Sequence, residues 1–188
     1  LKAGETILIH AAAGGVGSIA CQWAKAIGAT VIGTVGSAEK AERARAYGCD
    51  FPIIYTQQDF ADEVLAITDG KKVDVVYDSI GKDTFMQSLD CIKPRGLMVS
   101  FGNASGKPDP LDVLELAKRG SLYLTRPTLY HYTRTRDELV SSAARYLAML
   151  GQGKINITLG KTFALEQVAD AHRHLVDRAR VGSPILIP

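Results

Sequence analysis

Short apolar runs rich in β-branched residues alternate with amphipathic stretches along the first two-thirds of the chain. The apolar runs predict strands at Thr6–Ala11, Thr30–Val35, Phe51–Tyr55, Val73–Ser79, Gly96–Phe101 and Ser121–Thr125. The amphipathic stretches predict helices at Gly15–Ile27, Ala38–Tyr47, Asp59–Thr68, Thr84–Ile92 and Leu111–Lys118. Because such alternation is typical of a parallel sheet covered on both faces, we expect an α/β fold with a doubly wound parallel six-stranded sheet (Rossmann) in the order 3-2-1-4-5-6.

The rhythm changes after Arg126-Pro127. Two longer amphipathic stretches predict helices at Thr135–Gly151 and Leu165–Ala179, and Ile185–Pro188 predicts a short final strand. This tail is too small to form a core of its own. It must therefore dock either on the sheet or on a domain outside this chain.

Composition narrows the class of protein without identifying it. The chain has 188 residues, of which 46% are hydrophobic and 22% are charged, as in ordinary globular proteins. Its net charge of +2 gives no reason to expect nucleic acid or a membrane surface as a binding partner. No stretch has the length of a membrane span or the pattern of a signal peptide. The cysteines Cys21, Cys49 and Cys91 are odd in number and form no CxxC pair, which favours buried, reduced thiols in the cytoplasm. Because the chain begins with Leu1, we expect a fragment of a longer protein.

The segment Ala11–Gly17 (AAAGGVG) lies directly between the first predicted strand and the first predicted helix. Gly14 and Gly15 would let the backbone approach a pyrophosphate at the helix N-terminus without a Cβ in the way, and Gly17 would let the helix pack against the strands. Ala12 stands where this dinucleotide-binding motif has its first glycine, so the turn departs slightly from the pattern. The alternative interpretation is a tight glycine turn without a ligand.

The second predicted strand ends in Gly36-Ser37, without the carboxylate that usually binds the ribose 2′-hydroxyl of NAD. Lys40 lies in the first turn of the next helix, where its ammonium group could reach a 2′-phosphate, and Ser37 could add a hydroxyl donor. These residues favour NADP over NAD. Alternatively, Lys40 is an ordinary solvated residue, and Arg43, one turn further on, is a weaker competitor for the same role.

Several ordered motifs together resemble the quinone oxidoreductases of the zeta-crystallin-like, zinc-independent branch of the medium-chain dehydrogenase/reductase superfamily. The motifs are AAAGGVG, GTVGSAEK, VVYDSIG, GLMVSFGNASG, SLYLTRPTL and RARVGSPILIP. The resemblance covers nearly the whole chain. It implies NADPH as the cofactor, a quinone as the substrate, a homodimer and no zinc. It also implies that residues 1–127 form the NADP-binding domain and that residues 128–188 return to a catalytic domain outside this chain.

The resemblance also implies roles for individual residues. Gly15, Val16 and Gly17 match the pyrophosphate turn, and Gly36 and Lys40 match the 2′-phosphate site. The remaining matches are Tyr55 for the nucleotide, Ser79 beside the cofactor crevice, Phe101, Gly102 and Asn103 on the nicotinamide side, and Arg178 for the cofactor phosphates. Arg180 is close enough to Arg178 to be confused with it. Three residues at these positions also have a purely structural interpretation. Asp78 could be a turn or cap residue, Phe101 a core residue, and Tyr55 an edge residue.

The chain contains no convincing set of catalytic side chains. Hydride transfer from NADPH is the chemistry of the cofactor, and a quinone needs at most a proton from solvent. We expect His10, inside the first strand, to be a hydrogen-bonded core residue, and the other histidines show no metal-ligand spacing. His131, between two tyrosines, could border a planar substrate or simply pack against another domain.

Three functions remain open at this point. The first is NADPH-dependent reduction of a quinone, and the second is reduction of an enone, alkenal or enoyl thioester by a related enzyme. The third is a module that binds NADPH or senses redox state without turnover. An apolar edge strand invites pairing, and the resemblance implies that this edge pairs across a dimer, so we expect a homodimer through Ser121–Thr125.

Overall fold

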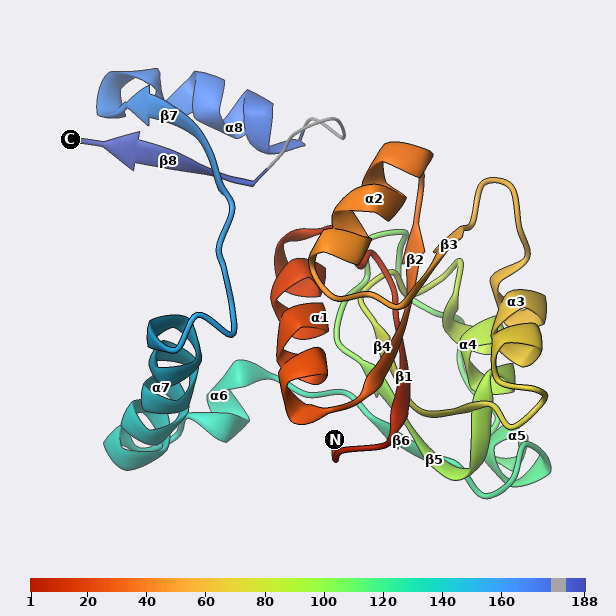
Figure 1. Cartoon of the computed structure of the whole chain (residues 1–188). Helices are drawn as coiled ribbons and strands as arrows, with labels where there is room; N and C mark the ends of the chain where they lie inside the picture. The colour runs from red at the N-terminus through yellow and green to blue at the C-terminus, as the bar shows by residue number, and fades with distance from the viewer. Residues whose placement is uncertain (177–181) are drawn as a thin grey trace.

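The computed structural model describes residues 1–176 and 182–188. Its main feature is a six-stranded parallel sheet in the order β3-β2-β1-β4-β5-β6, which confirms the predicted fold (Figure 1). The strands are β1 (Thr6–Ile9), β2 (Thr30–Val35), β3 (Phe51–Ile54), β4 (Val73–Asp78), β5 (Ile92–Ser100) and β6 (Tyr123–Thr125). The order reverses between β1 and β4, where open sheets of this kind bind their ligands.

Helices cover both faces of this sheet. In Figure 1, α1 (Gly15–Ile27) and α2 (Ala38–Ala46) lie on one face, and α3 (Phe60–Ile67) and α4 (Phe85–Asp90) lie on the other, with the short α5 (Leu114–Lys118) near β5. Local signals set the helix ends. Ser37 caps α2 by accepting a hydrogen bond from the Lys40 amide, and Gly28 ends α1 in a left-handed conformation with φ of +94°.

Alternation along the strands explains the two cores. In β1, Ile7 and Ile9 pack in the cluster that includes Cys21 and Ala24 of α1, whereas Leu8 between them packs in the cluster of α3 and α4. Successive side chains of a strand point to opposite faces, so a strand covered on both sides is apolar at every position. This is why the strands were recognisable as continuous apolar runs.

The fourth and fifth strands differ from the prediction at their junction. The sequence pattern placed Ile92 at the end of a helix, but Ile92 begins β5 and pairs with Val73. The register then shifts before Leu97 pairs with Val75, and Arg95 adopts a left-handed conformation with φ of +61°. A β-bulge therefore interrupts the strand, and the polar residues at the bulge made it resemble a turn.

Within the described residues, the tail contributes no strand to the six-stranded sheet. It comprises α6 (Leu129–Tyr132), α7 (Arg136–Gly151), β7 (Leu159–Ala164), the 3₁₀ turn η1 (Leu165–Gln167), α8 (Val168–Val176) and β8 (Ser183–Ile187). The strands β7 and β8 pair in parallel as a two-stranded sheet, with α8 between them in sequence. The sequence pattern missed β7, because only Phe163 of that strand is buried and no apolar run marks it.

Polar and aromatic contacts fasten the tail to α1 and α2. The Gln22 side chain bonds both backbone groups of Asn156, accepting from its N–H at 2.7 Å and donating to its C=O at 3.0 Å. The hydroxyl groups of Tyr47 and Thr158 lie 2.9 Å apart. Trp23 of α1 stacks against Tyr146 of α7 with ring centroids 6.2 Å apart. The tail is thus positioned by the helices beside the sheet.

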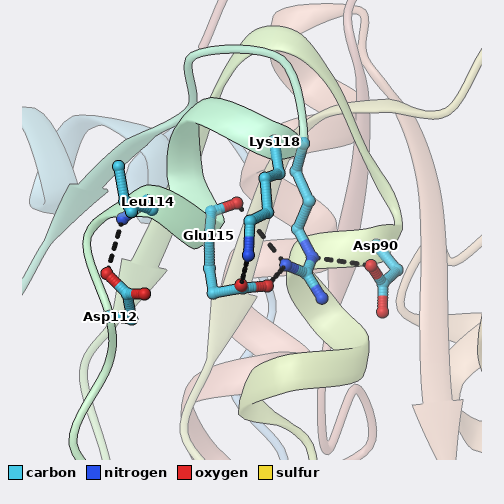
Figure 2. Close-up of polar contacts among 6 residues, drawn as sticks. Asp90, Asp112, Leu114, Glu115 and Lys118 are labelled. Atoms are coloured by element: carbon cyan, nitrogen blue, oxygen red, sulfur yellow. Dashed lines mark hydrogen bonds and ion pairs between the residues drawn. The ribbon is translucent and has the colours of Figure 1, made fainter.

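A cluster of charged side chains joins α5 to α4 (Figure 2). Arg119, just after α5, donates from Nε to Asp90 at 2.7 Å and from Nη1 to Glu115. Lys118 contacts the same Glu115 carboxylate at 2.6 Å. Hydrogen bonds from Lys118 and then from Arg119 hold the pKa of Glu115 below its usual value. Arg119 is the member that bridges the two helices, because it reaches both carboxylates.

We predict that Arg119→Gln lowers the thermal unfolding temperature at neutral pH more than Lys118→Gln does, since only Arg119 also bonds Asp90. A depressed carboxyl pKa contributes stability above the unfolded-state pKa, and this stability is lost as pH falls through the folded-state pKa. Thermal melts between pH 7 and pH 3 should therefore show the gap between wild type and Arg119→Gln closing at acid pH. An equal effect of both variants would contradict a bridging role.

Candidate functional site

A cleft of about 760 Å³ lies over the carboxyl ends of β1, β2 and β4, a volume typical of small-molecule sites. The predicted site residues that line it are Gly14, Gly15, Gly36, Lys40 and Tyr55. The opposite wall comes from the tail and includes Ile157, Thr158, Leu175, Val176, Gly182 and Ser183. Periodicity and local motifs did not predict these residues as part of the site, and only the resemblance, through Arg178, placed the tail near the cofactor.

The glycine turn has the geometry expected of an anion-binding helix start. Gly14 is the extended N-cap residue of α1 and offers no side-chain acceptor to the first amides of the helix. The space beside Gly15 is open, with no heavy atom within 4 Å of an added Cβ. Exposed N–H groups at a helix N-terminus favour phosphate. The backbone of this turn can therefore approach a pyrophosphate without steric obstruction.

Gly17 has a different role within the same turn. It is buried, and an added Cβ would lie 2.8 Å from the backbone carbonyl carbon of Ala12. Ala12 in turn fits because Gly33 of β2 has no side chain, since a Cβ on Gly33 would lie 2.5 Å from that of Ala12. The alanine at the first motif position is thus accommodated by a glycine on the neighbouring strand.

The end of β2 is shaped by Gly36 and Tyr55. An added Cβ on Gly36 would lie 2.9 Å from the Tyr55 hydroxyl group, so the tyrosine side chain approaches this glycine closely. Lys40 lies in the first turn of α2 and lines the cleft beside Gly36. Ser37 does not line the cleft, and its hydroxyl oxygen accepts from the Lys40 amide. The carboxylate that would exclude a 2′-phosphate is absent from this strand end.

The ends of β4 and β5 bring the other predicted residues together. Gly102 packs on Ser79, since an added Cβ would lie 2.8 Å from the Ser79 Cα. The Phe101 amide donates to the carbonyl oxygen of Asp78 at 2.8 Å, and Asn103 is exposed. Ser79, Phe101, Gly102 and Asn103 lie outside the cleft lining, as do Val16 and Gly17. Arg178 and Arg180 lie outside the described residues.

Asp78 holds the loop after β4 in place. Its buried Oδ1 accepts from the amides of Ile80 at 2.7 Å and Gly81 at 3.0 Å, and its Oδ2 accepts from the Thr84 hydroxyl at 2.8 Å. These contacts support the interpretation of Asp78 as a turn residue. Arg126, which the sequence analysis did not single out, donates to the carbonyl oxygen of Gly102 at 3.1 Å.

His10 is buried beneath the cleft and ties three elements together. Its Nδ1 lies 2.9 Å from the Thr34 hydroxyl and its Nε2 lies 2.8 Å from the Ser88 hydroxyl, and its ring meets that of Phe60 edge-on. The expectation of a hydrogen-bonded core histidine is confirmed. Burial lowers the pKa of His10 to about 4, although the charge of Asp78 partly opposes this shift.

Among residues 1–176 and 182–188, no group of three or more His, Cys, Asp or Glu side chains is placed to hold a metal ion. No helix in the same ranges has both the length and the apolar character needed to cross a membrane. All three cysteines are free and buried.

We predict that Gly17→Ala and Gly15→Ala differ in their effect on the stability of the fold. Gly17→Ala must displace the backbone of the turn, so it should lower the free energy of unfolding by about 2 kcal/mol or more, as other overpacked sites do. Gly15→Ala meets open space and should leave stability unchanged or slightly higher. Denaturant titration of both variants measures this difference. Similar losses in both would contradict the packing role of Gly17.

We also predict a pH dependence from His10. The pKa of His10 in the folded protein lies below the unfolded value of 6.5, so the unfolded chain takes up a proton first as the pH is lowered. The free energy of unfolding therefore falls as the pH drops from 6.5 to about 4. The full shift corresponds to about 3 kcal/mol. Denaturant titrations across this range should show a weaker pH dependence in His10→Gln than in wild type. Parallel pH profiles would argue against a neutral, buried His10.

Comparisons with known proteins agree with this arrangement. The family model described as zinc-binding dehydrogenase matches residues 15–147. The quinone oxidoreductase of Pseudomonas aeruginosa is 52% identical over 188 residues, and the 2-haloacrylate reductase of a Burkholderia species is 50% identical over 189 residues. Each match covers 100% of this chain but only 58% and 57% of the relative, so the chain spans somewhat more than half the length of these proteins.

Solved structures give the same result. The Escherichia coli quinone oxidoreductase complexed with NADPH is 47% identical, with a TM-score of 0.93, and the match covers 100% of this chain and 58% of that one. The family resemblance inferred from the sequence motifs is thereby confirmed. The chain belongs to the zinc-binding dehydrogenase family and, within the medium-chain dehydrogenase/reductase superfamily, it groups with the zeta-crystallin-like quinone oxidoreductases.

Proposed function

We propose that this chain is the NADPH-binding part of an NADPH-dependent quinone oxidoreductase, which transfers a hydride from NADPH to a quinone. The observation that carries the proposal is the cleft itself. It combines an open glycine turn at the N-terminus of α1 with Lys40 at the end of β2, where the acid of an NAD site is missing. The relatives at 52% and 47% identity, named as quinone oxidoreductases, support the substrate class.

The chain's own residues would divide the work of binding and orientation. The amides of Gly15, Val16 and Gly17 would bind the pyrophosphate, with Gly14 opening the turn, and Gly36, Ser37, Lys40 and Tyr55 would hold the adenosine end. Ser79 with Phe101, Gly102 and Asn103 would orient the nicotinamide end, and Arg178 would reach the phosphates. When bound, NADPH supplies the hydride. No side chain is assigned as a catalytic acid, because a quinone can take its proton from solvent.

The domain division and the partners also belong to this proposal. Residues 1–127 would form the NADP-binding domain, and residues 128–188 would return to a catalytic domain that holds most of the substrate pocket. The exposed Tyr123 and Leu124 of β6 lie on the edge strand, and we propose that this edge pairs across a homodimer. We place the enzyme in the cytoplasm, because free buried thiols are typical of a reducing compartment.

A second substrate class is favoured by one specific observation. The 2-haloacrylate reductase relative is as similar to this chain as the quinone oxidoreductases are. Reduction of an activated alkene, such as an enone, alkenal or enoyl thioester, would use the same cofactor cleft. Steady-state rates of the full-length protein with quinones and with α,β-unsaturated carbonyls would separate the two classes. Cofactor binding without turnover of either class would favour the non-catalytic module.

We predict that Lys40→Gln weakens NADPH binding by about 10- to 100-fold, the loss typical of one charge-assisted hydrogen bond, and leaves NADH binding nearly unchanged. Fluorescence titration with both nucleotides measures the two dissociation constants. Lys71→Gln, which removes the same charge from the exposed end of the α3–β4 connection, is the matched control. An unchanged NADPH-to-NADH preference in Lys40→Gln would overturn the role given to Lys40.

A further inference from the structure

The helix α2 presents a second cation to the cofactor cleft. Arg43 lies one turn after Lys40, and Tyr47 lies four residues further along, so the three side chains share one face of the helix. All three line the cleft. Two cations on adjacent turns therefore face the same space at the end of β2.

The sequence of α2 separates its side chains by face. Ala41 and Ala44 are buried against the sheet. Glu39 and Glu42 are exposed, and Glu42 forms an ion pair with Arg45 at 2.6 Å on the solvent side. Neither acid lines the cleft, and neither forms an ion pair with Arg43 in the part of the chain that the structure describes. This arrangement leaves the positive charge on the cleft face uncompensated by the helix itself.

Arg43 also lacks a polar partner elsewhere in the described protein. Its Nε is buried and has no hydrogen-bond partner, and its side chain forms no ion pair with residues 1–176 or 182–188. Buried donors without an acceptor are rare, because each loses its hydration without replacement. Arg45, two residues away, has the ordinary ion pair of a surface arginine.

Two acceptors in the cleft lining are already engaged by other groups. The Asp59 carboxylate is engaged by the amides of Ala61 and Asp62 and by the Gln87 side chain. The Thr158 hydroxyl on the tail wall is paired with Tyr47. Arg43 therefore keeps a donor available for a ligand in the cleft, and its position beside Lys40 favours an anionic one.

We propose that Arg43 is a specificity-determining residue that binds the 2′-phosphate of the dinucleotide together with Lys40. The inference rests on the proposed function and extends it to a residue that sequence reasoning ranked below Lys40. A phosphomonoester carries up to two negative charges, which two cations match, and its oxygens suit the planar donor fork of a guanidinium group. The Nε is buried, and the attraction between a guanidinium group and an anion is stronger where water is excluded.

Calorimetric titration with 2′,5′-ADP and with 5′-ADP isolates the 2′-phosphate from the rest of the cofactor. Arg43→Gln should weaken 2′,5′-ADP binding at least tenfold while changing 5′-ADP binding less than twofold. Arg43→Lys keeps the positive charge but lacks the planar set of guanidinium donors, so it should weaken 2′,5′-ADP binding by an intermediate amount. Arg45→Gln removes the same charge from the same helix on its solvent face and should change neither ligand more than twofold.

Each alternative outcome has a distinct meaning. If Arg43→Gln weakened both nucleotides equally, Arg43 would contact the adenine or the 5′-phosphates, and the inference would be overturned. The inference would also be overturned if Arg43→Gln, like Arg45→Gln, left the affinity for 2′,5′-ADP unchanged while Lys40→Gln still weakened it. In that case the proposed function would stand. If wild type showed no preference for 2′,5′-ADP, the NADP assignment itself would fail. Thermal melts of each variant confirm that the fold is retained.

Discussion

The close contact between the first turn of α1 and the backbone at the end of β1 determines where everything else in the site lies. Gly17 allows this contact, because any side chain there would collide with the backbone of Ala11 and Ala12. Ala12 depends in turn on the absence of a side chain at Gly33 in the next strand. With this packing in place, the free amides at the start of α1 lie directly above the carboxyl edge of the sheet, where the order of strands reverses.

The second determinant is the way the tail closes the cleft. The sheet and its helices supply one wall, and the tail supplies the other through contacts of Gln22 with Asn156 and of Tyr47 with Thr158. Tyr47 links the two walls because it lies on the same face of α2 as Lys40 and Arg43. The hydrogen bond between Tyr47 and Thr158 therefore places the tail wall beside the face of α2 that carries Lys40 and Arg43.

The sequence predicted the parts of this structure that depend on local pattern. The buried strands are apolar at every position, so their number and order could be inferred, and the glycine turn and Lys40 followed from neighbouring residues alone. The bulge in β5 and the strand β7 were missed, because neither has an apolar run. Roles for Tyr55, Phe101 and Asn103 came from family resemblance, although Phe101 and Asn103 also lie at the carboxyl end of a strand, where sheets of this kind bind ligands. The tail wall and the unpartnered Arg43 became visible only once distant segments were placed together.

The central claim is that the α1 turn and the cationic face of α2 together form an NADPH site. A crystal structure of this chain with NADPH tests it most directly. The account predicts pyrophosphate oxygens within hydrogen-bonding distance of the amides of Val16 and Gly17, and the 2′-phosphate between Lys40 and Arg43. A pyrophosphate bound away from the glycine turn, or a 2′-phosphate facing solvent away from α2, would contradict it.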